Sequence, residues 1–159
     1  MPKLKCKRCI SCTEIETPDV QEKVGIKIME KALIEKLAKK NILVIDDDGL
    51  ITRTLCSLLR KEGYFASGSE SSDEAVDEAE DVEYDLIIAD IKMPGTDGVE
   101  TIRKIQSEAM IHNRPIAPVV FITGYADDKS VSEAKELGEV MFKPFDNSEF
   151  LNRITKYLN

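Results

Sequence analysis

Residues 85–98 read DLIIADIKMPGTDG, an apolar run that stops at an aspartate and leads into a Met-Pro and an Asp-Gly element. Upstream, residues 41–47 read NILVIDD, a second apolar run that ends in acidic residues. Short continuous apolar runs bounded by polar residues are typical of strands that are covered on both faces of a parallel sheet. The two stretches therefore predict two strands of an α/β sheet, each ending in carboxylates.

From residue 41 onward, strand-like runs alternate with stretches of helical periodicity. This alternation is the pattern of βα units that form a parallel sheet. The predicted strands cover residues 41–46, 64–67, 85–90, 118–122 and 139–142. We therefore expect an α/β fold in which five βα units form a parallel sheet, with a helical extension at its N-terminus.

The predicted helices carry apolar residues at helical spacing. These residues are Ile51, Leu55, Leu58 and Leu59; Val99, Ile102 and Ile105; Val131, Ala134 and Leu137; and Phe150, Leu151, Ile154, Tyr157 and Leu158. Gly63 and Gly138 stand where helices should end. Asp48 is the expected N-cap of the first of these helices, and Asp146 with Glu149 predicts a capping box that opens the last one.

The chain divides near residue 40 by charge. Residues 1–40 carry ten Lys or Arg and six Asp or Glu, whereas residues 41–159 carry twelve and twenty-four. An acidic main body repels phosphate backbones, so we expect no direct nucleic-acid binding. No apolar run approaches the length of a membrane span, so we expect a cytoplasmic protein without membrane insertion. The sequence predicts an N-terminal arm and helix in residues 1–40 and one domain in residues 41–159.

The N-terminal part contains a cysteine-bearing arm, a Thr17-Pro18 break and one helical segment over residues 19–40. Ile26, Met29, Leu33 and Leu37 form an apolar stripe on this segment. We expect the stripe to dock on the chain's own domain. A dimer or partner surface is the alternative.

Three of the four cysteines are Cys6, Cys9 and Cys12, spaced like the first three thiolates of a bacterial iron–sulfur motif. Glu16 occupies the fourth place, so the motif is incomplete. A reduced thiol arm is the favoured interpretation, and a zinc or cluster site that acts as a metal or redox sensor is the alternative. Cys56 lies near the apolar stripe of its helix and is predicted to be a core residue.

Polar residues stand at the ends of four predicted strands: Asp46 with Asp47, then Asp90, Thr123 and Lys143. Ligands of an open parallel sheet bind outside the carboxyl ends of its strands, so these groups should converge. Three carboxylates together favour a cation, and an all-oxygen set suits Mg²⁺. A lysine and a hydroxyl beside them are the groups that stabilise a transferring phosphoryl group, for which one carboxylate would be the nucleophile.

Four motifs carry a resemblance to a known family: LVIDD at residues 43–47, DIKMPGTDG at 90–98, FITG at 121–124 and FKPF at 142–145. Together they resemble the receiver domain of two-component response regulators over residues 41–159. The motifs occur in the family's order and on the matching strands. The resemblance implies a flavodoxin-like (βα)5 fold, which is a doubly wound parallel sheet of order 2-1-3-4-5. The sequence ends with the last helix, so we expect a stand-alone, chemotaxis-regulator-like receiver without an output domain.

The resemblance implies that Asp90 accepts a phosphoryl group from a histidine kinase or a histidine phosphotransfer protein. It implies a Mg²⁺ site formed by Asp46, Asp47, Asp90 and the backbone carbonyl of Lys92, with Asp47 as a direct ligand and Asp46 acting largely through water. The chain would not be a turnover enzyme, because it would only take up phosphate and lose it slowly. The kinase is unidentified.

Further roles follow from the same resemblance. Thr123 would bond a phosphoryl oxygen, Lys143 would pair with the acceptor, and the Lys143–Pro144 peptide would be cis. Phosphorylation would change the surface near the last two helices and the last strand, and so alter the binding of an unidentified output protein. A homodimer through the N-terminal helix or through that surface is an alternative.

One departure concerns the readout of activation. The family places Tyr or Phe three residues before the lysine, and Val140 stands there in this chain. Phe142, Tyr125 or a movement of the helix after residue 127 are the candidate substitutes. Lys92 and Tyr125 occupy positions where the family tunes the lifetime of the phosphate.

Other interpretations are weaker. A calcium loop at residues 46–49 would need acids at Val44 and Leu55. An aspartyl-phosphate hydrolase would have a second acid where Lys92 stands. His112 is expected to be a solvent-facing loop residue, not a phosphodonor. A binding module that keeps the receiver fold but works without phosphorylation is the remaining alternative.

Overall fold

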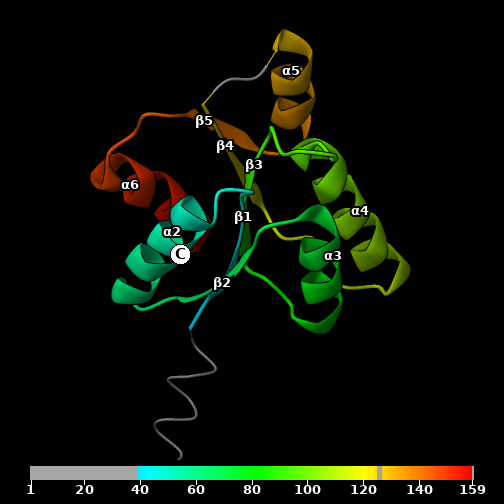
Figure 1. Ribbon diagram of the computed structural model, residues 1–159. Coiled ribbons are helices and arrows are strands. Elements are labelled where there is room, and N and C mark those ends of the chain that lie inside the picture. Colours follow the sequence, from blue (N-terminus) through cyan, green and yellow to red (C-terminus); the bar gives the residue numbers. More distant parts are fainter. Residues whose placement is uncertain (1–38, 125–126, 159) are drawn as a thin grey trace, which may run out of the picture. The chain divides into compact units, whose positions relative to one another are not determined.

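The computed structural model describes residues 39–124 and 127–158 (Figure 1). The strands are β1 (Asn41–Ile45), β2 (Phe65–Ser69), β3 (Leu86–Asp90), β4 (Val119–Thr123) and β5 (Glu139–Phe142). The helices are α2 (Gly49–Lys61), α3 (Ser72–Asp81), α4 (Gly98–Ile111), α5 (Asp128–Leu137) and α6 (Asn147–Leu158). Residues 19–38 of the predicted N-terminal helix, the cysteines Cys6, Cys9 and Cys12, and Tyr125 lie outside the described residues. Lys39 and Lys40, the last two residues of that predicted helix, are described and are not helical. Within the described ranges, no helix has the length and apolar character that crossing a membrane requires.

All strand pairs are parallel, and the sheet order is β2-β1-β3-β4-β5. This order confirms the predicted doubly wound, flavodoxin-like fold. The order reverses between β1 and β3, the place where this architecture binds ligands. Ile45 of β1 pairs with Ala89 of β3, so the residues that follow them, Asp46 and Asp90, lie beside each other.

Helices cover both faces of the sheet (Figure 1), with α2 and α6 on one face and α3, α4 and α5 on the other. Alternate residues of each strand point to opposite faces, and each face has its own core. Val44 and Ile88 pack toward α2 and α6, whereas Leu43 and Ile87 pack toward α3 and α4. Two-sided burial explains why β1, β3 and β4 are almost wholly apolar. The predicted core position of Cys56 is confirmed, since only 3% of it is exposed.

Local signals set the helix ends. The Asp48 carboxylate accepts a bond from the Leu50 amide at 2.8 Å, which confirms the predicted N-cap of α2. Gly63 has a φ of +94°, a conformation that a glycine adopts without strain just after a helix. The capping box of α6 is only half formed, because the Glu149 amide donates to Asp146 at 2.8 Å while its carboxylate accepts from Arg153 at 3.2 Å.

Four of the five predicted strands had bounds that were wrong by one or two residues. β1 ends one residue earlier than predicted, at Ile45, and β3 begins one residue later, at Leu86. β2 covers Phe65–Ser69 instead of 64–67, because its pairing with β1 continues to Ser69 even though its last residues have weak strand propensity. β4 covers Val119–Thr123 instead of 118–122, because Thr123 is still paired with Phe142 of β5. The shift of β4 places Thr123 inside a strand.

Candidate functional site

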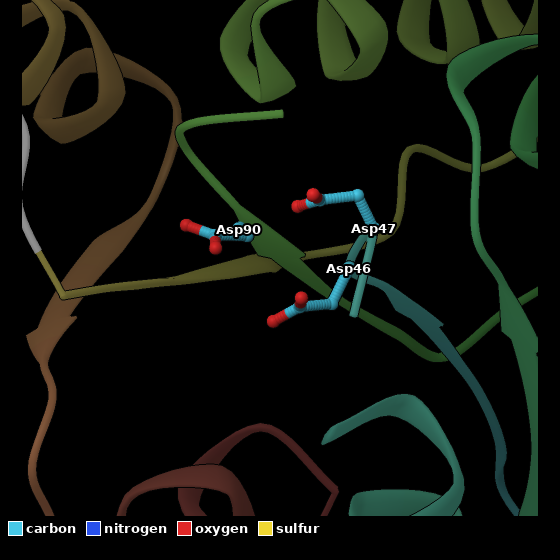
Figure 2. Close-up of side chains that lie close together, drawn as sticks. All are labelled: Asp46, Asp47 and Asp90. Carbon is cyan, nitrogen blue, oxygen red and sulfur yellow. The ribbon is translucent and has the colours of Figure 1, made fainter. Parts of the chain in front are cut away.

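Acidic side chains from two adjacent strand ends meet at the switch point of the sheet. Asp46 directly follows β1 and is 4% exposed, and Asp90 is the last residue of β3. Figure 2 shows the carboxyl groups of Asp46, Asp47 and Asp90 around one space beyond the strand ends. One carboxylate oxygen from each residue lies within 4.8 Å of the other two. The predicted convergence of the three acids is therefore present.

Lys143 brings a positive charge to this cluster from the end of β5. Its Nζ lies 2.8 Å from Oδ2 of Asp46 and 3.3 Å from Oδ2 of Asp90. The Lys143 amide donates to the Thr123 carbonyl at 2.8 Å, which anchors the start of the segment after β5 to β4. The Lys143–Pro144 peptide is cis, as the resemblance implied. One ammonium thus bridges two of the three carboxylates.

The site is partly withdrawn from water, and this shifts the pKa values of its charged groups. Burial raises the pKa of the Asp90 carboxyl, and the Asp46 charge adds to this, although Lys143 opposes both. Burial alone would lower the pKa of Lys143, but the two carboxylates outweigh it and raise the pKa. Lys143 therefore stays positively charged beside the two carboxylates.

Thr123 ends β4 next to Asp90 and is fully buried. Its Oγ1 makes no hydrogen bond with the residues that the structure describes. A buried hydroxyl without a partner is uncommon, because the loss of its bonds to water is then uncompensated. The unpaired donor indicates that Thr123 is available to a ligand oxygen at the ends of the strands.

The loop between β3 and α4 holds the acceptor strand close to α4. The Gly98 amide donates to the Ile91 carbonyl at 2.8 Å, and a Cβ at residue 98 would collide with the Asp90 carbonyl oxygen. Only glycine allows this approach. The Lys92 amide donates to Oδ1 of Asp90 at 3.3 Å, so the loop also contacts the acceptor carboxylate directly.

Several positioning residues were not predicted from the sequence. Thr52 of α2 donates its hydroxyl to the Asp46 carbonyl at 2.9 Å in a buried contact. Asp97 and Asp127 cap α4 and α5, and both lie within 4 Å of the Lys92 ammonium. An aspartate just before a helical stretch is a detectable N-cap signal, but no sequence signal reports the shared lysine.

The residues outside this cluster have plainer environments. His112 caps the C-terminal end of α4 and is exposed, as expected, and its Nε2 lies 3.6 Å from Glu108. Val140 packs partly buried against the core beneath α4 and α5, where the family has an aromatic ring. Phe142 is 54% exposed, so its ring has no buried position behind Thr123 in this structure.

The donor set fits Mg²⁺. One oxygen from each of three carboxylates lies within 4.8 Å of the other two, so all three can reach one cation. One lysine faces two of these carboxylates, which leaves a formal excess of two negative charges. Mg²⁺ takes oxygen ligands, uses few carboxylates and keeps several waters, so a partly open acidic site of this kind suits it. Asp46, Asp47, Asp90 and the Lys92 carbonyl remain the predicted ligands.

The comparisons with known proteins agree with this geometry. Residues 42–155 match the family model described as the response regulator receiver domain, so the chain belongs to the response-regulator receiver family. It is 31% identical over 127 residues to the transcriptional regulatory protein ResD of Bacillus subtilis, covering 79% of this chain and 50% of ResD. It is 35% identical over 119 residues to the transcriptional regulatory protein PdtaR of Mycobacterium tuberculosis, covering 72% of this chain and 55% of PdtaR. The chain thus spans about half the length of these two relatives.

A relative of similar size is sporulation initiation phosphotransferase F of Bacillus subtilis. The two are 31% identical over 124 residues, which cover 77% of this chain and 96% of the relative. Among solved structures, a CheY-like receiver domain from Methanospirillum hungatei has a TM-score of 0.68 at 27% identity, covering 76% of this chain and 94% of that one. The response regulator TrrA of Thermotoga maritima, solved with Mg²⁺ and BeF, has a TM-score of 0.64 at 30% identity, covering 74% and 98%.

Proposed function

We propose that this chain is a phospho-acceptor of a two-component pathway and that Asp90 takes a phosphoryl group from a phosphohistidine of a histidine kinase or a histidine phosphotransfer protein. The observation that carries the proposal is the position of the Lys143 ammonium, which lies 3.3 Å from Asp90 and 2.8 Å from Asp46. A structural ion pair needs one carboxylate. A lysine shared by two acids beside a third is suited to an additional anionic ligand with its own cation.

The transfer itself needs one nucleophile and one leaving group. An Asp90 carboxylate oxygen attacks phosphorus, the P–N bond to the donor imidazole breaks, and the imidazole takes a proton from solvent. Lys143 stabilises the negative charge of the transferred group, and the unpaired Thr123 hydroxyl donates to one of its oxygens. Asp46, Asp47, Asp90 and the Lys92 carbonyl would hold Mg²⁺. The chemistry that Mg²⁺ supplies when bound is neutralisation of the phosphoryl oxygens.

The remaining parts of the proposal concern the wider role. The phosphate is lost by slow hydrolysis, so the chain is a signalling protein and not a turnover enzyme. The output is a change in the surface of α5, β5 and α6 that alters the binding of a partner protein. We place the protein in the cytoplasm without direct contact to nucleic acid, in keeping with its acidic domain.

Intact-mass measurement after treatment with acetyl phosphate tests the proposal. Wild-type protein should gain the mass of one phosphoryl group with Mg²⁺ and none without it, and Asp90→Asn should gain none. Asp73→Asn, which removes an exposed acid from α3, is the matched control and should label as wild type does. Labelling that persists in Asp90→Asn, or wild-type protein that never labels, would reject the proposal and leave the phosphorylation-independent binding module in its place.

A further inference from the structure

The ammonium of Lys92 lies among three side chains from the starts of two helices. Its Nζ is 2.8 Å from Oδ2 of Asp127, 3.2 Å from Oγ of Ser130 and 3.9 Å from Oδ2 of Asp97. The Ser130 hydroxyl also lies 3.0 Å from Oδ2 of Asp127. We call Lys92, Asp97, Asp127 and Ser130 the Lys92 clasp.

Two members of the clasp are helix caps. Asp97 accepts from the Val99 amide at 2.8 Å at the start of α4, and Asp127 accepts from the Ser130 amide at 2.9 Å at the start of α5. Each carboxylate thus satisfies a helix N-terminus with one oxygen and faces Lys92 with the other.

Residue 92 contacts the acceptor with its main chain while its side chain reaches α5. The Lys92 amide donates to Oδ1 of Asp90, and only Ile91 separates the two residues in the chain. A change in the charge or hydrogen bonding of the Asp90 carboxylate therefore acts first on the residue whose ammonium contacts the cap of α5. The contact between Lys92 and Asp127 joins segments 35 positions apart in the sequence.

The clasp is weak enough to be changed by one additional anion. The side chains of Lys92 and Asp127 are 47% and 53% exposed. Ion pairs between side chains this exposed contribute little to the free energy of folding. A phosphoryl group on Asp90 adds negative charge and acceptor oxygens beside residue 92. Their negative charge attracts the Lys92 ammonium, which Asp127 also attracts.

We infer that Lys92 is a positioning residue that couples the charge at Asp90 to the first turn of α5 through the clasp. The inference rests on the proposed function and adds a route for its output. In the unmodified chain the clasp ties the start of α5 to the acceptor segment. Phosphorylation draws the Lys92 ammonium away from Asp127 and loosens the first turn of α5. This route needs no aromatic ring at position 140, where this chain has Val140.

Amide hydrogen exchange of the full chain tests the inference, with Mg²⁺ and beryllium fluoride as the probe that stands in for the phosphoryl group. In wild-type protein, amides of the first turn of α5 should exchange severalfold faster with the probe than without it. Lys92→Met should exchange fast there before the probe is added and should change little afterwards. Asp127→Asn should behave in the same way, because Asn still caps the helix but cannot form the ion pair.

Two further variants separate coupling from a merely structural role. Lys92→Arg keeps the positive charge and should restore the response to the probe. Lys129→Met removes another lysine of α5, whose ammonium lies 3.7 Å from Glu133 and which is not part of the clasp. This variant should respond as wild type does.

The outcomes distinguish this inference from the proposed function. If amide exchange at the end of β3 in wild-type protein is unchanged by the probe, the proposed acceptor site is refuted, and the inference is refuted with it. A second outcome is that the probe changes amide exchange at the end of β3 but changes it in the first turn of α5 by the same amount in wild type, Lys92→Met and Asp127→Asn. That result would support the acceptor site and refute the coupling through Lys92.

Discussion

The Nζ of Lys143 lies 3.3 Å from Oδ2 of Asp90, although the two residues are 53 positions apart in the chain. The parallel sheet creates this contact, because β3 and β5 both end at the same edge with only β4 between them. The position of Lys143 is therefore a property of the fold, and the site is preorganised for a negatively charged ligand.

Replacement of Lys143 should impair phosphorylation more than it impairs folding. Lys143→Met removes the positive charge that faces both Asp46 and Asp90, so labelling by acetyl phosphate should slow by roughly 100-fold. Time-resolved intact mass measures the rate. Lys104→Met, which removes an exposed lysine of α4, serves as the control and should keep the wild-type rate. A Lys143→Met protein that labels as fast as wild type would show that the lysine is only a structural partner.

Addition of Mg²⁺ should stabilise the folded chain. A ligand that binds only the native state at about 100 times its Kd contributes roughly 2.7 kcal/mol, so the thermal unfolding temperature should rise with Mg²⁺ and fall again with EDTA. Asp47→Asn should lose most of this increase, because it removes one of the three converging carboxylates. An equal rise of the unfolding temperature in Asp47→Asn and wild type would show that Mg²⁺ does not bind at this site.

Gly98→Ala should destabilise the domain and disturb the acceptor. A Cβ at residue 98 meets the main-chain carbonyl of Asp90, which cannot move without shifting β3. Overpacking of this kind costs about 1–3 kcal/mol, and urea unfolding measures it. Gly95→Ala has open space around its Cβ but a φ of +83°, so it should cost only about 1 kcal/mol. A Gly98→Ala protein as stable as wild type would contradict the close approach.

Glu139 should contribute stability that depends on pH. Burial alone would raise its pKa, but bonds from Tyr157 and Arg153, each 2.8 Å long, outweigh burial and lower the pKa below its usual 4.5. A lowered folded-state pKa gives stability that is present above the usual pKa and is lost as the pH falls through the folded value.

The unfolding free energies of wild type and Glu139→Gln should therefore differ most near neutral pH and converge in acid. Urea unfolding at a series of pH values measures this. Glu100→Gln, an exposed acid of α4 that lies near Lys104, should show a smaller dependence. A difference between wild type and Glu139→Gln that grows in acid would reverse the sign and refute the account.

Pattern alone predicted most of the fold and the convergence of the site. β1, β3 and β4 are buried on both faces, so their sequences are unbroken apolar runs, and a polar residue marks the end of each. β2 was harder, because FASGS contains small residues whose strand state comes from pairing with β1. Sequence pattern therefore predicts strands that are buried on both faces, but it predicts poorly a strand such as β2, whose structure depends on its neighbour.

The contacts made by Lys92 show what the sequence could not supply. Its place two residues after Asp90 was visible, but the direction of its side chain depends on how the loops before α4 and α5 approach each other. Val140 was visible as a departure from the family pattern. The route that we propose through Asp127 depends on two helix caps that face one lysine, a contact that only the structure shows.

Chemical trapping of the acyl phosphate tests the central claim most directly. Borohydride reduces an aspartyl phosphate to homoserine, so protein treated with acetyl phosphate and Mg²⁺ should yield homoserine at residue 90 when its peptides are mapped by mass spectrometry. Protein treated without Mg²⁺ should retain aspartate there. Homoserine at residue 46 or 47, or at none of the acids of the site, would contradict the assignment of Asp90 as the phospho-acceptor.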